Sequence, residues 1–173
     1  MTMFLSNRDG GKTDQEGHYR FQTNVWGGQV LTGLNVTQAS PLAMKVLVNA
    51  GEAKIPYNGY GFTIWIPTGD DEEIVISTAN PSNPRIDRIV AYIDLAETPQ
   101  TTTPNNPGIP KVAVVTGTPG SSPTRPSDGD VDTFLSSNPW INLSDVAVGA
   151  AVTQITNANI TDTRVFLTLP NNS

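Results

Sequence analysis

Short runs of alternating apolar and polar residues make up most of the patterned part of this chain, and turns that contain Gly or Pro separate them. Residues 60–66 (YGFTIWI), for example, carry an apolar side chain at every second position. Alternation of this kind places successive side chains on opposite faces of an extended strand. Nowhere does the sequence carry the 3.6-residue period of a long amphipathic helix. The pattern therefore predicts an all-β protein.

The composition agrees with this fold class. Thr, Asn and Ser together provide 47 of the 173 residues, and there are 15 Gly and 14 Pro. The side chains of Thr, Asn and Ser form local hydrogen bonds, which favour turns and strand edges over helix interiors. We expect one antiparallel β-sandwich or Greek-key-like barrel of about eight strands, since strands of this chain recur at short spacing.

The strands can be placed by residue range. Within residues 43–77 the pattern predicts a meander of three antiparallel strands with an Asn58-Gly59 hairpin turn. Residues 86–93 are expected to form a central strand, because both faces of this segment carry apolar residues. Further strands are expected at residues 29–37, 111–116, 140–148 and 164–169. Residues 131–137 are expected to form one helical turn, with Asp128 or Asp130 as its N-cap.

The polar and Pro-rich segments predict how the chain is organised. Residues 1–28 are rich in turn formers and are expected to be an extended arm, followed by a single β-sandwich domain over residues 29–173. Loops 98–110 and 117–130 are long and rich in Pro or Gly, which is typical of functional connections. We expect the arm and these two loops to make most contacts between subunits. Candidate interface residues in the arm are His18, Tyr19, Arg20 and Trp26.

Several kinds of functional site are excluded by what the sequence lacks. With no Cys and one His, it has no disulfide, no thiolate metal site, no cysteine nucleophile and no cage of several histidines. His18 lies in the polar arm, where nothing local would position a catalytic base. The net charge of −6 argues against nucleic acid as a partner. No run of apolar residues approaches the ~20 that span a bilayer, so no membrane partner is expected. We therefore predict no catalytic residues, no cofactor and no enzymatic activity.

Two segments of the chain are rich in acidic residues. Asp128, Asp130 and Asp132 alternate as at the start of a calcium loop, but Thr133 and Pro139 stand where that loop needs Gly and Glu. No metal centre is predicted here, although a looser surface calcium site on these three carboxylates is an alternative. The run Asp70-Asp71-Glu72-Glu73 is expected to be a solvated turn.

Four charged residues stand out by their positions. Asp87 and Arg88 lie within the predicted central strand, and Asp162 and Arg164 share one face of an extended segment because they are two residues apart. Charges among core strands are usually paired and hydrogen-bonded. We predict a structural Asp–Arg ion pair between these two segments.

The three tryptophans allow two interpretations. Trp26, Trp65 and Trp140 could form a platform on which a sugar stacks, or they could fill the core and subunit interfaces, which is the commoner use of Trp. The two interpretations differ in where the aromatic side chains lie. Exposed aromatic residues along one groove favour glycan binding, and buried ones favour a structural role.

Four segments of the chain follow one another in a characteristic order. They are NPRID at residues 83–87, the turn VVTGTPGSSP at 114–123, the strand INLSDVAV at 141–148 and the closing segment ITNANITDTR at 155–164. In this order they resemble tailed-bacteriophage virion proteins of the tail, baseplate and fibre-adaptor type. The resemblance spans roughly residues 40–166. It implies a β-domain that assembles as a homo-oligomer, and it brings no catalytic motif.

Together these features predict a non-enzymatic structural component of a bacteriophage virion. We expect an adaptor or fibre-attachment module in the tail, baseplate or neck, assembled in the host cytoplasm, where the absence of Cys is unsurprising. Its expected partners are other copies of itself and other virion proteins. The alternatives are a carbohydrate-binding β-sandwich that recognises a host surface glycan, and a capsid decoration protein.

Overall fold

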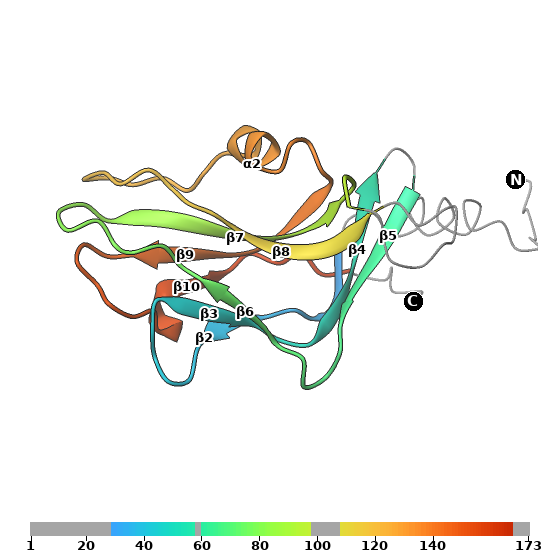
Figure 1. Ribbon diagram of the computed structural model, residues 1–173, viewed down its shortest axis with the longest axis horizontal. Coiled ribbons are helices and arrows are strands. Elements are labelled where there is room, and N and C mark those ends of the chain that lie inside the picture. Colours follow the sequence, from blue (N-terminus) through green and yellow to red (C-terminus); the bar gives the residue numbers. More distant parts are fainter. Residues whose placement is uncertain (1–28, 58–59, 98–107, 168–173) are drawn as a thin grey trace, which may run out of the picture.

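The computed structural model describes residues 29–57, 60–97 and 108–167. In this part of the chain, ten strands form three antiparallel sheets, accompanied by one short α-helix and one 3-10 helix (Figure 1). The all-β sandwich predicted from the sequence is confirmed, and the described strands do not close into a barrel. No helix among these residues has the length and apolar character needed to cross a membrane.

The largest sheet has four strands, in the order β10 (Ile160–Asp162), β9 (Trp140–Val148), β7 (Arg85–Asp94) and β8 (Ile109–Val115). β7 pairs with β9 on one side and β8 on the other. Most of its residues are buried, as expected for a strand that is covered on both faces. The central strand predicted at residues 86–93 is therefore confirmed.

The other two sheets have three strands each. One has the order β1 (Gln29–Gly33), β4 (Gly51–Tyr57), β5 (Tyr60–Ile66), and the other β2 (Val36–Gln38), β3 (Lys45–Val48), β6 (Glu72–Val75). The predicted three-strand meander is wrong, because β3 pairs with β6 while β4 and β5 lie in a different sheet. β4 was not predicted, since Gly51 and Pro56 are unfavourable in strands and obscure its alternation.

The chain changes sheets at a tight corner. The strand predicted at residues 29–37 divides into β1 and β2 at Gly33 and Leu34, whose φ angles are +57° and +58°. A positive φ is costly for Leu, but the Leu34 side chain is completely buried, which compensates. Gly51 packs against this corner, where an added Cβ would lie 2.2 Å from the Leu34 backbone nitrogen.

Two further predictions need correction. In the described part of the strand predicted at residues 164–169 there is a single bridge, between Phe166 and Val30, and the last regular strand that the structure describes is β10. The helix is α2 (Asp128–Phe134), and its N-cap is Ser127, not Asp128 or Asp130. The reason is a capping box, in which the Ser127 hydroxyl accepts from the Asp130 amide and the Asp130 carboxylate accepts from the Ser127 amide.

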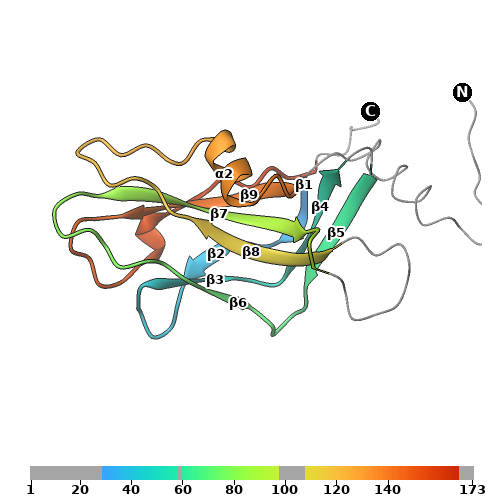
Figure 2. The same ribbon diagram turned by 45° about the horizontal axis from the view of Figure 1, so that its top comes forward.

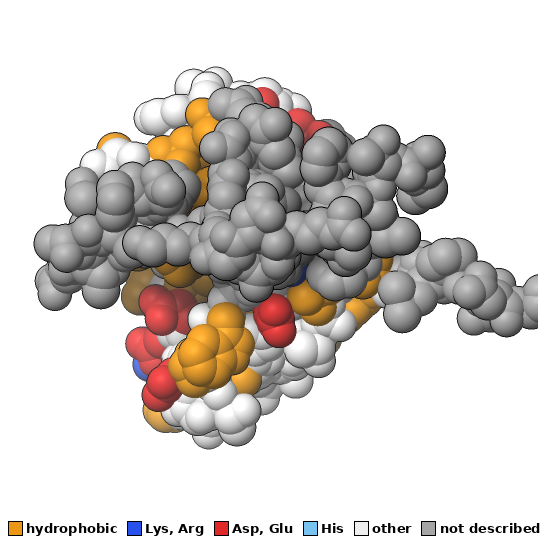
Figure 3. All heavy atoms as spheres, turned by 90° about the vertical axis from the view of Figure 1, so that its right-hand side faces the viewer, with side chains coloured by type: hydrophobic (Ala, Val, Ile, Leu, Met, Phe, Trp, Pro, Cys, Tyr) orange, Lys and Arg blue, Asp and Glu red, His pale blue; other side chains and the backbone are white. Residues whose placement is uncertain are grey.

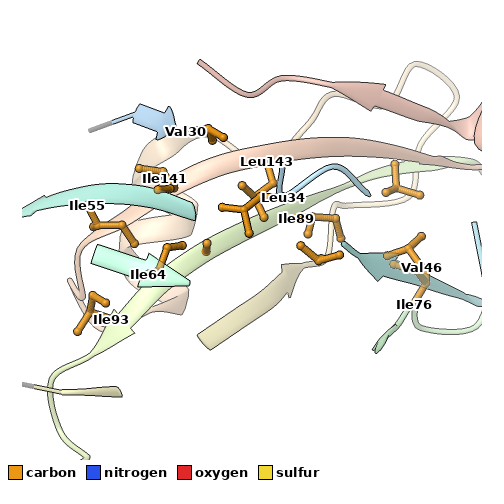
Figure 4. Close-up of a cluster of buried hydrophobic side chains, with 14 of the residues drawn as sticks. Val30, Leu34, Val46, Ile55, Ile64, Ile76, Ile89, Ile93, Ile141 and Leu143 are labelled. Atoms are coloured by element: carbon orange, nitrogen blue, oxygen red, sulfur yellow. The ribbon is translucent and has the colours of Figure 1, made fainter. Parts of the chain in front are cut away.

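The main core lies between the sheets and takes side chains from all three of them (Figure 4). Its labelled members are Val30, Leu34, Val46, Ile55, Ile64, Ile76, Ile89, Ile93, Ile141 and Leu143. A smaller cluster of Val90, Val115, Val131 and Leu135 joins the opposite face of the four-stranded sheet to α2. Helix α2 accordingly lies over this sheet, on the side away from the other two (Figures 1 and 2).

We predict that Gly51→Ala destabilises the protein by at least about 2 kcal/mol, because the added methyl group meets the backbone of the β1–β2 corner. Gly120→Ala is the matched control, since nothing lies within 4 Å of the Cβ position there. Urea unfolding followed by circular dichroism measures both changes. Equal stability of the two variants would contradict the packing described for the corner.

Candidate functional site

Two oppositely charged residues of β7 are completely enclosed. The exposed fractions of Arg85 and Asp87 are 3 % and 0 %, and Arg85 Nε lies 2.9 Å from Asp87 Oδ1. Arg85 also donates to the backbone carbonyls of Ser77 (2.6 Å) and Thr78 (2.9 Å). Asp87 Oδ1 accepts from the Gly117 amide at 2.9 Å. The pair therefore joins β7 to the segments that precede it and that follow β8.

Arg88 forms a second buried link, on the other face of β7. Its Nη1 donates to Asp128 Oδ1 (2.7 Å) and to the Pro126 carbonyl (3.0 Å), and its Nε donates to Asn142 Oδ1 (3.0 Å). The guanidinium carbon lies 4.9 Å from the centre of the Trp140 ring, within cation–π range. These contacts hold α2 and the loop before it on the sheet.

Asp162 and Arg164 form a third ion pair, near the end of the described chain. Arg164 Nη2 lies 2.6 Å from Asp162 Oδ2, and Arg164 Nη1 donates to the Gly33 carbonyl at 2.6 Å. The guanidinium also lies over the Phe166 ring, with 4.9 Å to its centre. The hydrogen bonds from Arg164 lower the pKa of the Asp162 carboxyl group. This pair ties the closing segment to the β1–β2 corner.

The ion pair predicted between the Asp87–Arg88 segment and the Asp162–Arg164 segment is therefore wrong, although all four residues are in ion pairs. Asp87 pairs with Arg85, Arg88 with Asp128, and Asp162 with Arg164. The physical reason is the strand order, since β9 lies between β7 and β10. Strands two places apart are separated by about 10 Å. Asp87 and Asp162 instead pair with arginines only two residues away, Arg85 and Arg164.

The alternative of a calcium site on Asp128, Asp130 and Asp132 receives no support. Asp128 pairs with Arg88, Asp130 completes the helix cap, and Asp132 accepts from the Trp140 indole at 2.8 Å. Hydrogen bonds from Ser127 lower the pKa of Asp130. The described part of the chain contains no group of three or more His, Cys, Asp or Glu residues that could hold a metal ion.

The predicted interface segments are only partly described. His18, Tyr19, Arg20 and Trp26 lie outside the described residues, as do positions 98–107 of loop 98–110. Loop 117–130 is described. Gly117 is held by Asp87, and Gly120 donates to the Pro84 carbonyl at 2.9 Å.

A groove of about 510 Å³ opens between β5, the turn after it and the start of β8. Its most prominent wall is Trp65, which is 67 % exposed and stands opposite Glu52 of β4. The other lining residues are Leu34, Ile64, Ile66, Pro67, Asp70, Glu72, Ala91, Pro110, Lys111 and Val112. Figure 3 shows the end of the molecule that lies on the right in Figure 1, where acidic side chains stand beside exposed hydrophobic ones. We call this feature the Trp65 groove.

The acidic run next to this groove is Asp70-Asp71-Glu72-Glu73. In an extended chain, successive side chains point to opposite sides, so alternate carboxylates of this run have different surroundings. Asp71 accepts from the Ala50 amide (3.0 Å) and Glu73 from the Lys45 ammonium (2.7 Å), so both serve the fold. Asp70 and Glu72 instead line the groove. The expected solvated turn therefore also forms one side of a groove, which sequence reasoning did not foresee.

Lys111 lines the groove but is already paired. It donates to Asp94 Oδ2 at 3.0 Å and to Glu97. These hydrogen bonds raise the pKa of Lys111, and the same contact lowers the pKa of Asp94. No sequence signal pointed to Lys111, because the groove is assembled from distant segments.

The tryptophans do not share a platform as far as the structure describes them. Trp140 is half-buried and lines a different groove, of about 210 Å³, with Gln29 and Val165 among its neighbours. Trp65 is therefore the described tryptophan that meets the condition for glycan binding, an exposed aromatic side chain along a groove.

Comparison with known proteins gives no match, whether with family models, curated proteins or solved structures.

We predict that Asp87→Ala lowers the free energy of unfolding by about 3–5 kcal/mol, because it leaves a buried guanidinium without its counter-charge. Asp162→Ala removes a carboxylate that is largely exposed and should cost at most about 1 kcal/mol. Urea unfolding at pH 7 compares the two. A cost for Asp87→Ala no larger than that of the control would show that the buried pair is not needed.

The lowered pKa values predict acid sensitivity. Asp94, Asp130 and Asp162 each release their proton more readily in the folded chain than in the unfolded one. Their stabilising effect is complete above the unfolded pKa, about 4, and is lost as the pH falls through the folded pKa. We expect the free energy of unfolding to decrease below pH ~4, and to decrease less in Asp162→Asn. Denaturant unfolding between neutral and acidic pH measures this, and identical pH profiles for the variant and the unmodified chain would contradict it.

Proposed function

We propose that this chain is a non-enzymatic structural module of a bacteriophage virion, an adaptor or fibre-attachment part of the tail, baseplate or neck that assembles as a homo-oligomer. The proposal is supported by the four segments that resemble virion proteins. One contains the start of β7, two contribute nearly all of β9 and the whole of β10, and the fourth contains the end of β8 and the loop after it. The resemblance is therefore concentrated in one sheet.

The observation that carries the proposal is what the polar groups of these segments do. Asp87 of the first segment accepts from Gly117 of the second, and the Pro84 carbonyl accepts from Gly120. Arg164 of the last segment donates a hydrogen bond to the Gly33 carbonyl. These groups are used to hold the fold together, which favours a structural role over a catalytic one.

One end of the molecule has the features of an assembly surface. The start of β1, the tips of β4 and β5, and the junction of β7 with β8 lie at this end (Figure 1). Residues 1–28 and the loop between β7 and β8, both expected to contact other subunits, join the described fold here. Val165 (61 % exposed) and Phe166 (43 % exposed) lie beside β1, where the Val30 amide donates to the Val165 carbonyl and the Val30 carbonyl accepts from the Leu167 amide. Exposed apolar residues next to such junctions favour contact with another copy.

We predict that the full chain forms an oligomer, with a solution mass at least twice the 18.5 kDa of one copy. Deletion of residues 1–24 should give a monomer that still unfolds cooperatively, because the deleted segment precedes every strand that the structure describes. Light scattering coupled to size exclusion gives the mass, and circular dichroism reports the fold.

Three results would contradict the proposal. A monomeric full chain at micromolar concentration, or an arm-deleted chain with the mass of the full assembly, would contradict assembly through the arm. Mass spectrometry of purified particles of the phage that encodes the chain tests the virion location. Absence of its peptides from those particles would rule that location out.

A further inference from the structure

We propose that the Trp65 groove is a saccharide-binding site that selects neutral or amino-bearing sugars over acidic ones. This inference does not rest on the proposed assembly, since every residue it uses belongs to one chain. The volume of the Trp65 groove, about 510 Å³, is in the range of small-molecule sites, roughly 300–1,000 Å³.

The walls of the groove match the two kinds of surface on a sugar ring. The Trp65 indole is 67 % exposed, and its electron-rich face suits the weakly positive C–H face of a pyranose. The apolar lining residues that reach the surface are Ile66, Pro67, Pro110 and Val112, whereas Leu34 and Ala91 are fully buried. An apolar lining with a few polar groups at the rim is typical of small-molecule sites.

The rim supplies acceptors for hydroxyl groups. Asp70 and Glu72 line the groove, and neither is in an ion pair with another described residue. Their neighbours Asp71 and Glu73 are bound to the fold, so the alternation leaves two carboxylates available to a ligand. A sugar hydroxyl can donate to such a carboxylate, and charge-assisted hydrogen bonds are the stronger ones.

The charge of the groove decides which sugars it accepts. Asp70 and Glu72 are the acidic residues that line it. Glu52 stands opposite Trp65 on the neighbouring strand but does not line the groove, and its charge interacts with Lys54. The lysine of the groove, Lys111, is held by Asp94 and Glu97 and adds no unpaired positive charge. The groove is therefore negative, which repels uronic, sialic or phosphorylated sugars and favours neutral or amino sugars.

A second copy of the chain is a less suitable occupant. A symmetric contact through this face would bring the same carboxylates from both copies together, and like charges facing each other are destabilising. Self-association through Trp65 is nevertheless a measurable outcome of the experiment below.

The test is titration of the full chain with three trisaccharides, in which calorimetry and tryptophan fluorescence measure binding. The probes are the trimers of N-acetylglucosamine (neutral), glucosamine (amino) and galacturonic acid (acidic). We expect the first two to bind and the third to bind at least tenfold more weakly. Trp65→Ala should weaken binding at least tenfold, Trp65→Phe should retain part of it, and Glu72→Gln should reduce the preference for the amino sugar.

Phe134→Ala is the matched control, because Phe134 is also exposed but lines a different groove beside α2. It should leave sugar binding unchanged. Failure of both non-acidic trimers to bind, equal binding by Trp65→Ala, or equal affinity for the acidic trimer would overturn the proposal. A lower solution mass of Trp65→Ala would also overturn it, by assigning Trp65 to a subunit contact. Loss of assembly on deletion of residues 1–24 is measured separately, so the two proposals can fail independently.

Discussion

The buried carboxylate of Asp87 is the interaction on which the rest of the fold depends. An unpaired charge in the interior is costly, and Asp87 tolerates complete burial because Arg85 and the Gly117 amide saturate it. Arg85 in turn satisfies the carbonyls of Ser77 and Thr78, in the chain that leads from β6 to β7. One ion pair thus fixes both the entry to the central strand and the exit from its neighbour β8. Loss of either partner would leave the other as an uncompensated charge.

The same strand organises two layers by simple alternation. Ile89, Ala91 and Ile93 point into the core between the sheets, whereas Val90 belongs to the cluster under α2. Arg85 and Asp87 share the odd-numbered face and Arg88 lies on the even-numbered one. Each face of β7 therefore combines an ionic link at one end with apolar packing further along. The ionic links specify which loops attach to the sheet, and the apolar residues supply most of the burial.

Local patterns predicted the strands whose alternation is uninterrupted, and the two-sided apolar pattern predicted the central position of β7. They did not predict β4, because Pro56 and Gly51 are unfavourable in strands, nor the division of residues 43–77 between two sheets, because strand pairing depends on distant segments. The partner of Asp87 could have been found, since Arg85 is two residues away and shares its face. The Trp65 groove could not, because β5, the acidic turn and β8 are brought together only by the tertiary fold.

The two proposed roles use opposite edges of one sheet. In the order β1, β4, β5, the β1 edge carries the exposed Val165 and Phe166, and the β5 edge carries the Trp65 groove. The first edge is apolar and can be covered by another copy, while the second is rimmed by Asp70 and Glu72, which oppose a symmetric contact. Charge therefore separates a surface suited to assembly from one suited to a ligand. Both surfaces lie at the end where β7 joins β8, and Pro110, at the end of loop 98–110, lines the groove. In an oligomer that leaves the groove open, weak sugar binding by single grooves could add up through multivalency.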